Sequence, residues 1–188
     1  MLFPVFLKLE GRRVLVVGGG KVAAGKIAGL LAAGASVEVV APEIRPEIAG
    51  EHVHVEQREF RDSDVDGAWY VVAAAPPDVN RAVQRAGEAR QVFVNAVDDP
   101  QHASAYAGGV VRREGVTIAI STDGRAPALA GLLREAFEAW LPAELDDWMA
   151  AADAARREWK SRDVPMEERR PQLLRVLNEL YDRRKTPN

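Results

Sequence analysis

The sequence has 188 residues, of which 47% are hydrophobic, and a formal net charge of −3 at neutral pH. This composition is that of a folded globular chain, long enough for one full-size domain and an appendage. The small negative charge disfavours nucleic acid as a partner, because nucleic-acid-binding proteins are generally basic. Since the chain has no cysteine, it holds no disulfide, thiolate metal site or cysteine nucleophile.

The opening segment, Met1 to Leu9, is apolar but short. It lacks the basic start of a signal peptide, and it is too short to span a membrane. We therefore expect a cytoplasmic protein with neither a membrane nor a nucleic-acid partner.

A strand, a glycine-rich turn and a helix are predicted near the start of the chain. The run from Arg12 to Val17 is rich in β-branched residues and stops at glycines, as a buried parallel strand does. Apolar residues then recur at helical spacing until Gly34, a residue type that commonly ends helices. A second apolar run, Val37 to Val40, completes a βαβ unit.

The turn between the first strand and its helix has the pattern G-x-G-x-x-A. Small residues there let the backbone approach a pyrophosphate, and the helix N-terminus offers free N–H groups to it. In this context the pattern indicates a nicotinamide dinucleotide site, with a tight glycine turn lacking any ligand as the alternative. The predicted cofactor-binding residues are Gly18, Gly19, Gly20, Lys21, Val22, Ala23, Pro42 and Glu43.

The choice between NAD and NADP depends on the residues after the second strand. Glu43 can accept hydrogen bonds from the ribose hydroxyls, which favours NAD. Arg45 can instead pair with the 2′-phosphate of NADP. We expect NAD as the cofactor, with NADP as the alternative.

The rest of the chain divides into a parallel β/α part and a different C-terminal part. In the first, the predicted elements are strands at Val53 to Phe60, Trp69 to Ala75 and Val92 to Val97, with a helix from Asp78 to about Arg90. In the second, a hairpin signal and amphipathic helices follow. The predicted elements there are strands at Gly108 to Arg112 and Val116 to Ser121, and helices at Pro127 to Trp140, Leu145 to Arg162 and Met166 to Arg184.

The predicted fold class is therefore α/β. A Rossmann-like parallel sheet domain is followed by a small α+β domain and a helical C-terminal domain. The boundaries inferred from the change of hydrophobic period are 1–99, 100–142 and 143–188.

Several short motifs, in this order, resemble one family. They are Pro4-Val5-Phe6, Gly11-Arg12, the glycine turn with Lys26, Asn95-Ala96-Val97-Asp98, and Ser121-Thr122-Asp123-Gly124-Arg125-Ala126-Pro127. Together they resemble precorrin-2 dehydrogenase, the dehydrogenase and ferrochelatase module of siroheme synthesis, up to about Pro142 and more loosely beyond. The chain ends before the methyltransferase domain of longer relatives, so we expect the stand-alone form.

The resemblance implies NAD-dependent oxidation of precorrin-2 to sirohydrochlorin by a homodimer that forms through the central domain. It also implies that Asp98 is the catalytic acid–base residue, which fits because hydride loss to the nicotinamide accompanies proton loss. Asp99 is the competing carboxylate, and both side chains have the alternative role of capping the following turn. Whether ferrous iron is also inserted stays open. Iron would then be a substrate, and no resident metal site is predicted.

Substrate-binding candidates follow from the many carboxylates of the macrocycle. Hydroxyl and N–H groups after a strand can contact carboxylates, and arginine pairs with them in a bidentate manner. His102 is a second acid–base or contact candidate. The alternatives are a cap of the Pro127 helix and solvated surface arginines. The predicted substrate-binding residues are Ser121, Thr122, Gly124, Arg125, Arg112 and His102.

Two other functions compete with this one. A regulatory Rossmann module that senses a dinucleotide without catalysis would share the glycine turn, but it would not require the Asp98 turn, the arginine-rich hairpin or the helical tail. A chelatase that uses the fold only as a scaffold would insert metal without cofactor turnover. The sequence favours the dehydrogenase.

Overall fold

The computed structural model describes residues 2–50, 52–97 and 99–185. The chain forms two compact units. The first comprises the chain up to Ala107 together with Ser121–Ala126, and the second comprises Gly108–Ile120 and the chain from Pro127 onward. The predicted division into three domains at residues 99 and 142 stays a prediction.

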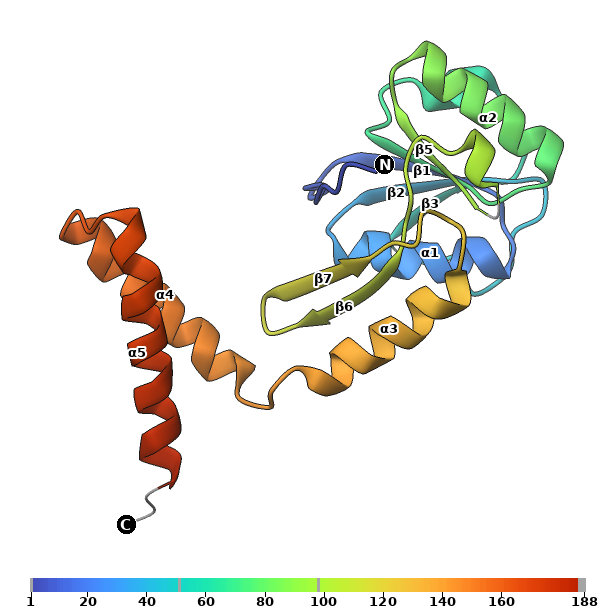
Figure 1. Ribbon diagram of the computed structural model, residues 1–188. Helices are drawn as coiled ribbons and strands as arrows, with labels where there is room; N and C mark the ends of the chain where they lie inside the picture. The colour runs from blue at the N-terminus through green and yellow to red at the C-terminus, as the bar shows by residue number, and fades with distance from the viewer. Residues whose placement is uncertain (1, 51, 98, 186–188) are drawn as a thin grey trace. The chain divides into compact units, whose positions relative to one another are not determined.

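The first unit is a five-stranded parallel sheet with helices on both faces (Figure 1). Helix α1 (Lys21–Ala32) covers one face and α2 (Pro77–Ala89) covers the other. The spatial order β3-β2-β1-β4-β5 is that of the Rossmann fold, so the predicted α/β class is confirmed. The strands are β1 (Arg13–Val17), β2 (Ser36–Val40), β3 (Val53–Glu56), β4 (Tyr70–Ala73) and β5 (Phe93–Ala96).

Strand β1 lies at the centre of the sheet, which explains its uninterrupted apolar sequence. Val14 and Val16 pack in one core cluster with Ile27 of α1. Leu15 packs in a second cluster with Val83 of α2. Because both faces are covered, the strand shows no alternation of apolar and polar residues.

Strands β3 and β4 are shorter than predicted by three residues or more. Strand β3 ends at Glu56, and the chain then turns toward a short 3-10 helix, η1 (Asp62–Val65), so the prediction of a strand up to Phe60 is wrong. Phe60 packs against the second core cluster instead, and its apolar side chain therefore reflects core packing rather than a strand. Strand β4 is limited to Tyr70–Ala73.

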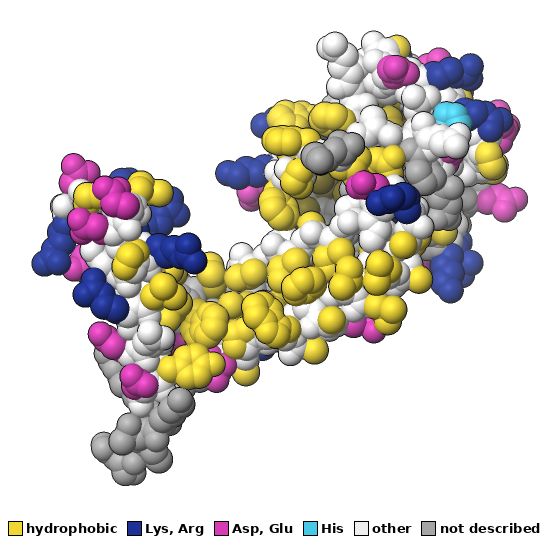
Figure 2. Space-filling model, in the orientation of Figure 1, with side chains coloured by type: hydrophobic (Ala, Val, Ile, Leu, Met, Phe, Trp, Pro, Cys, Tyr) yellow, Lys and Arg dark blue, Asp and Glu magenta, His cyan; other side chains and the backbone are white. Residues whose placement is uncertain are grey.

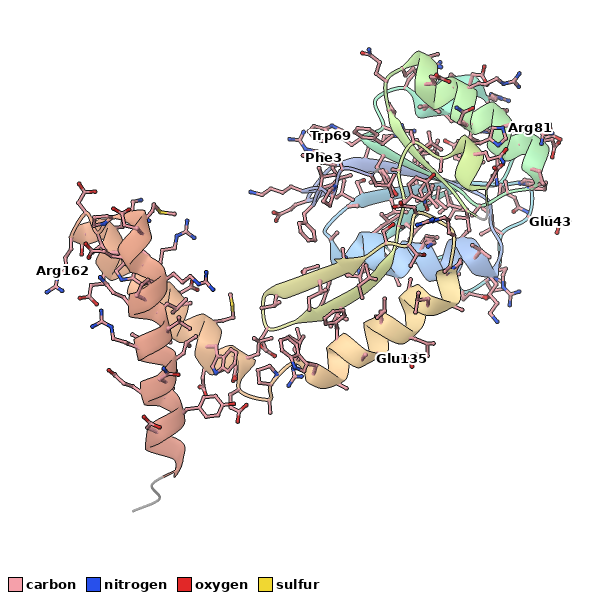
Figure 3. All side chains as sticks on the ribbon, viewed as in Figure 1. Phe3, Glu43, Trp69, Arg81, Glu135 and Arg162 are labelled. Atoms are coloured by element: carbon pink, nitrogen blue, oxygen red, sulfur yellow. The ribbon has the colours of Figure 1, made fainter. Side chains whose placement is uncertain are left out.

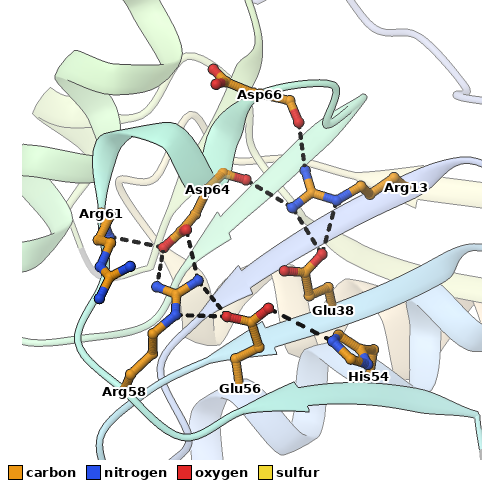
Figure 4. Close-up of polar contacts among 8 residues, drawn as sticks. All are labelled: Arg13, Glu38, His54, Glu56, Arg58, Arg61, Asp64 and Asp66. Atoms are coloured by element: carbon orange, nitrogen blue, oxygen red, sulfur yellow. Dashed lines mark hydrogen bonds and ion pairs between the residues drawn. The ribbon is translucent and has the colours of Figure 1, made fainter.

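A network of ion pairs and hydrogen bonds links η1 to the sheet (Figure 4). The two Nη atoms of Arg58 donate to the Asp64 carboxylate, each at 2.8 Å, and its Nε donates to Glu56 of β3 at 2.6 Å. Arg13 of β1 donates to the Asp64 carbonyl oxygen at 2.9 Å and to the Glu38 carboxylate of β2 at 2.8 Å. The network thus joins three strands to the segment that follows β3.

Asp64 is the buried acid of this network, with 7% of its surface exposed. Burial alone would raise the pKa of its carboxyl, but hydrogen bonds from Arg58 and from the Arg61 N–H outweigh burial and lower the pKa. Because the folded-state pKa lies below the unfolded value of about 4, the carboxylate stabilises the fold above that pH. This contribution is lost as the pH falls through the folded-state pKa.

We expect Asp64→Asn to lower the free energy of unfolding by about 2 kcal/mol at neutral pH, because the buried carboxylate that pairs with the half-buried Arg58 guanidinium is lost. The difference from wild type should shrink once the pH falls below about 4. Urea unfolding of wild type and variant, at neutral pH and at a pH below about 4, measures this difference in stability. Asp62→Asn is the control, since Asp62 is exposed in the same short helix. A loss of stability that is equal at both pH values would contradict the electrostatic explanation.

The second unit contains a hairpin and three helices. Strands β6 (Gly109–Arg113) and β7 (Val116–Ile120) pair antiparallel through Glu114 and Gly115, whose φ values of 47° and 79° are those of a tight hairpin turn. The helices are α3 (Pro127–Trp140), α4 (Leu145–Ser161) and α5 (Met166–Lys185). The hairpin and all three helices agree with the predicted elements. Within the described ranges, no helix has the length and apolarity to cross a membrane.

Candidate cofactor and active site

The glycine turn between β1 and α1 lies against two neighbouring loops. Gly18 has a φ of 121°, and a Cβ there would overlap the carbonyl oxygen of Ala74, just beyond β4. A Cβ on Gly19 would overlap the carbonyl oxygen of Glu43, and the Gly19 carbonyl accepts a hydrogen bond from the Arg45 N–H at 3.0 Å. The packing of the protein itself therefore requires these two glycines.

Gly20 differs from both. It is the N-cap residue of α1, and a Cβ there would meet no atom within 4 Å. The first N–H groups of a helix have no partner within the helix, and they give this end a partial positive charge. The free space above Gly20 therefore fits a pyrophosphate that contacts the backbone of the turn.

A cleft of about 630 Å³ opens above this turn, at the carboxyl ends of β1, β2 and β4. This volume is within the range of small-molecule sites, and the position is where ligands bind in open α/β sheets. Figure 3 shows Glu43 at this edge of the first unit, opposite the edge where Phe3 and Trp69 lie.

The predicted cofactor residues divide into two groups. Those that line the cleft are Gly18, Gly19, Gly20, Pro42 and Glu43. Lys21 and Val22 are exposed in the first turn of α1 and do not line it. Ala23 is buried in the first core cluster, where a small side chain lets α1 pack closely on the sheet. The binding role of each of these residues stays a prediction.

Several lining residues were not predicted as site residues. They come from the segments that follow β3 and β4 and from the first turns of α2, and they are Glu59, Phe60, Ala74, Ala75, Pro76, Asp78, Val79 and Ala82. Most are apolar, which suits the flat face of an adenine ring. The signal that could have found them is their position at the end of a predicted strand or in the segment that follows it.

Hydrogen bonds fix the loops around the cleft. Gln57 Nε2 donates to the Pro42 carbonyl oxygen at 3.2 Å, and Arg58 Nη1 donates to the Glu59 carbonyl oxygen at 3.0 Å. The side-chain oxygen of buried Asn80 accepts from the Ala75 N–H at 3.0 Å. The walls of the cleft are therefore set by the protein before any ligand binds.

Strand β5 ends at the same edge of the sheet, and the predicted acid–base residue follows it. Asp98 itself lies outside the described residues. The Asp99 carboxylate lies 2.8 Å from Nδ1 of His102, in the short 3-10 helix η2 (Pro100–His102). Asp99 thus has a partner in its own turn, and His102 does not line the cleft.

Asn95 of β5 also contributes to this region. Its Nδ2 donates to the Ala105 carbonyl oxygen at 3.0 Å, which links the segment after η2 to the strand. Its Oδ1 is buried and has no hydrogen-bond partner in the described part of the chain.

The hydroxyls predicted to bind substrate make local hydrogen bonds. Ser121 Oγ accepts from the Asp123 N–H, and Thr122 Oγ1 accepts from the Ala126 N–H just before α3, both at 3.2 Å. Both bonds lie in the turn before α3 and neither reaches an N–H of the helix itself. An oxygen that accepts in this way can still donate its own hydrogen.

The remaining candidates lie outside the cleft as well. Gly124 has a φ of 73° in the turn before α3, and Arg125 is exposed beside it. Arg112 is exposed on β6 of the second unit. Substrate contact by these residues stays a prediction. Over the described ranges, no group of three or more histidine, aspartate or glutamate side chains is arranged to hold a metal ion.

A Rossmann sheet with this glycine turn and a cleft at its carboxyl edge defines a dinucleotide-binding protein. Comparison with known families agrees, since residues 5–109 match the NAD(P)-binding family model NAD_binding_7. The chain belongs to this NAD(P)-binding family. The predicted nicotinamide dinucleotide cofactor is thereby confirmed.

The chain is also similar to siroheme synthases. It is 41% identical to siroheme synthase 3 of Aeromonas hydrophila over 172 residues, and 42% identical to the siroheme synthase of Photorhabdus laumondii over 173 residues. Each alignment covers 89% of this chain and 37% of the relative, so the chain spans little more than a third of their length. The predicted resemblance to the siroheme synthase module is confirmed.

A solved structure described as "SirC, precorrin-2 dehydrogenase" has the same fold. The TM-score is 0.69, and the match covers 93% of this chain and 89% of that chain at 24% identity. At this level of identity, the likeness concerns the fold.

Proposed function

We propose that this protein oxidises precorrin-2 to sirohydrochlorin with NAD+ as the hydride acceptor. The observation that carries the proposal is the 41% identity to a siroheme synthase across 89% of the chain. The cleft at the sheet edge supports it, because a dehydrogenase needs a bound dinucleotide next to its substrate.

The chain's own residues account for cofactor binding in this proposal. The Gly20 backbone and the start of α1 hold the pyrophosphate, and the Glu43 carboxylate accepts hydrogen bonds from the ribose hydroxyls. Phe60 and Val79 line the cleft, where their apolar side chains would pack against the adenine. When bound, the nicotinamide ring takes up the hydride that leaves the macrocycle.

The oxidation also releases a proton, and in this proposal Asp98 accepts it. Strand β5 ends at Ala96 on the edge that carries the cleft, and Asp98 is two residues further along the chain. Of the two hydrogens removed, one leaves as a hydride, with its electron pair, to NAD+. The other leaves as a proton to the carboxylate and passes from there to water, so the reaction balances.

Anaerobic turnover tests the proposal. Purified protein with enzymatically generated precorrin-2 and NAD+ should produce NADH and a sirohydrochlorin absorbance spectrum in equal amounts. NADH binding without turnover would contradict the dehydrogenase and favour the dinucleotide-sensing module. Metal insertion without NADH formation would favour a chelatase that uses the fold only as a scaffold.

Insertion of ferrous iron is a second candidate activity, favoured by the name siroheme synthase that the relatives carry. Iron is a substrate in this step, and it replaces two pyrrole protons of sirohydrochlorin. When ferrous iron is added after oxidation is complete, the sirohydrochlorin absorbance spectrum should change to that of the iron-containing product. This change should be faster with the protein than without it.

The proposal includes a homodimer that forms through the second unit and a location in the cytoplasm. Helix α3 leaves a row of large apolar side chains exposed (Figure 2), among them Leu132, Phe137 and Trp140, which are 65%, 39% and 74% exposed. Apolar faces of this kind commonly pack against a second subunit. Sedimentation should show a dimer in wild type, and Trp140→Glu should shift it toward the monomer.

A further inference from the structure

The cleft has an uneven distribution of charge. Glu43 and Glu59 are among its lining residues, whereas the lining includes no lysine, arginine or histidine. Both glutamates are exposed. Asp78 also lines the cleft, but it lies in the first turn of α2, where the helix dipole offsets its charge.

The position of the two glutamates corresponds to one end of a bound dinucleotide. Rossmann proteins hold the ribose of the adenosine half with an acid after the second strand, and NADP-dependent members place an arginine there for the 2′-phosphate. Glu43 follows β2, and Glu59 follows the neighbouring strand β3. A 2′-phosphate at this end of the cleft would therefore meet a lining that carries two glutamates.

Glu59 is held in place by the network that follows β3. Arg58 donates to the Glu59 carbonyl oxygen at 3.0 Å while its guanidinium binds Asp64 in a bidentate manner. The Glu59 side chain itself makes no hydrogen bond with the described residues that would remove its charge from the cleft. Arg58, itself held by Asp64, thus fixes the backbone that carries this side chain.

Arg45 is the cation closest in sequence to the ribose position, and its charge is already paired. Its backbone N–H contacts Gly19, but its Nε donates to the Glu47 carboxylate at 2.5 Å. The side chain of Arg45 does not line the cleft. Arg45 therefore has a carboxylate partner outside the cleft, and its role as a 2′-phosphate ligand stays the alternative.

We infer that Glu59, acting with Glu43, selects NAD over NADP by electrostatic repulsion of the 2′-phosphate. Glu43 binds the ribose hydroxyls and Glu59 adds a second negative charge beside them. The inference rests on the proposed use of NAD, and it assigns separate tasks to the two carboxylates. Removal of Glu43 affects both dinucleotides, whereas removal of Glu59 affects only the phosphorylated one.

Titration of the full-length protein with NADH and NADPH, followed by nucleotide fluorescence, tests this without any tetrapyrrole. Wild type should bind NADH more tightly than NADPH. Glu59→Gln should tighten NADPH binding about 3- to 10-fold, because one negative charge is removed near a phosphate of charge about −2. The same variant should leave NADH binding within about 2-fold of wild type. Glu43→Gln should weaken NADH binding about 3- to 10-fold, since a charged acceptor of hydroxyl hydrogen bonds is lost.

The matched control is Glu88→Gln, which makes the same charge change on the exposed side of α2 away from the cleft. It should leave both dissociation constants unchanged. An unaltered ratio of the two constants in Glu59→Gln, or an equal gain in Glu88→Gln, would overturn the inference. So would equal binding of NADH and NADPH by wild type. Because no substrate is present, failure of the dehydrogenase proposal would leave these results unaffected.

Discussion

Gly20→Ala is expected to weaken NADH binding at least about 10-fold while changing the free energy of unfolding by less than about 1 kcal/mol. A Cβ on Gly20 meets no protein atom within 4 Å, so the fold can accept it. The same methyl group would keep a pyrophosphate away from the backbone of the turn, because the close approach needs the absence of a side chain. Fluorescence titration with NADH and urea unfolding measure the two effects separately.

Gly19→Ala should lower stability as well as NADH binding. Its Cβ would overlap the carbonyl oxygen of Glu43, and backbone atoms cannot move aside as a flexible side chain can. We expect a loss of about 3 kcal/mol of stability together with the loss of NADH binding.

Gly25→Ala provides the control for both variants. It makes the same chemical change in the interior of α1, with no atom within 4 Å, and should raise stability by up to about 1 kcal/mol without affecting NADH binding. Unchanged NADH affinity in Gly20→Ala would show that the pyrophosphate does not lie over this turn.

The elements that were predicted most accurately are those whose signals are local. The strand before the glycine turn, the helix after it and the hairpin at Glu114 and Gly115 each depend on contiguous residues. Gly34, predicted to end α1, has a φ of 73°, as a residue following a helix commonly does. The physical causes of these features act over a few residues, so a single sequence is sufficient to find them.

The walls of the cleft could not be predicted in the same way. Glu59, Phe60 and Ala74 are distant in the sequence from Gly18, and they meet only because the parallel register aligns the ends of β3, β4 and β1. The error at β3 has a similar origin. Phe60 is apolar because it packs in the core, and an apolar residue near a strand end does not reveal whether the strand continues.

The ion pairs were not predicted either, although their partners are close in the sequence. The bidentate pair of Arg58 and Asp64 and the pair of Arg45 and Glu47 involve surface residue types that usually remain solvated. The second pair gives Arg45, the alternative ligand for a 2′-phosphate, a carboxylate partner on the surface. Only the three-dimensional contacts show which charges remain available to a ligand.

Asp98→Asn is expected to lower kcat for precorrin-2 oxidation by about 100- to 10,000-fold, the range that a general acid–base group contributes. Asparagine keeps the shape of the side chain but cannot accept the proton that leaves with the hydride. NADH binding should stay within about 2-fold of wild type, because the predicted cofactor contacts come from the glycine turn and Glu43. Anaerobic turnover and NADH titration measure the two quantities on the same preparation.

Asp99→Asn separates the two neighbouring carboxylates. Asp99 pairs with Nδ1 of His102 at 2.8 Å, so its replacement removes a contact within the turn and should lower kcat less than about 10-fold. If Asp99→Asn abolished turnover and Asp98→Asn did not, the base would be Asp99, and His102 would be the residue that orients it. A third outcome is a large loss of kcat in both variants and in His102→Ala. It would mean that the pair of Asp99 and His102 sets the geometry of the whole turn.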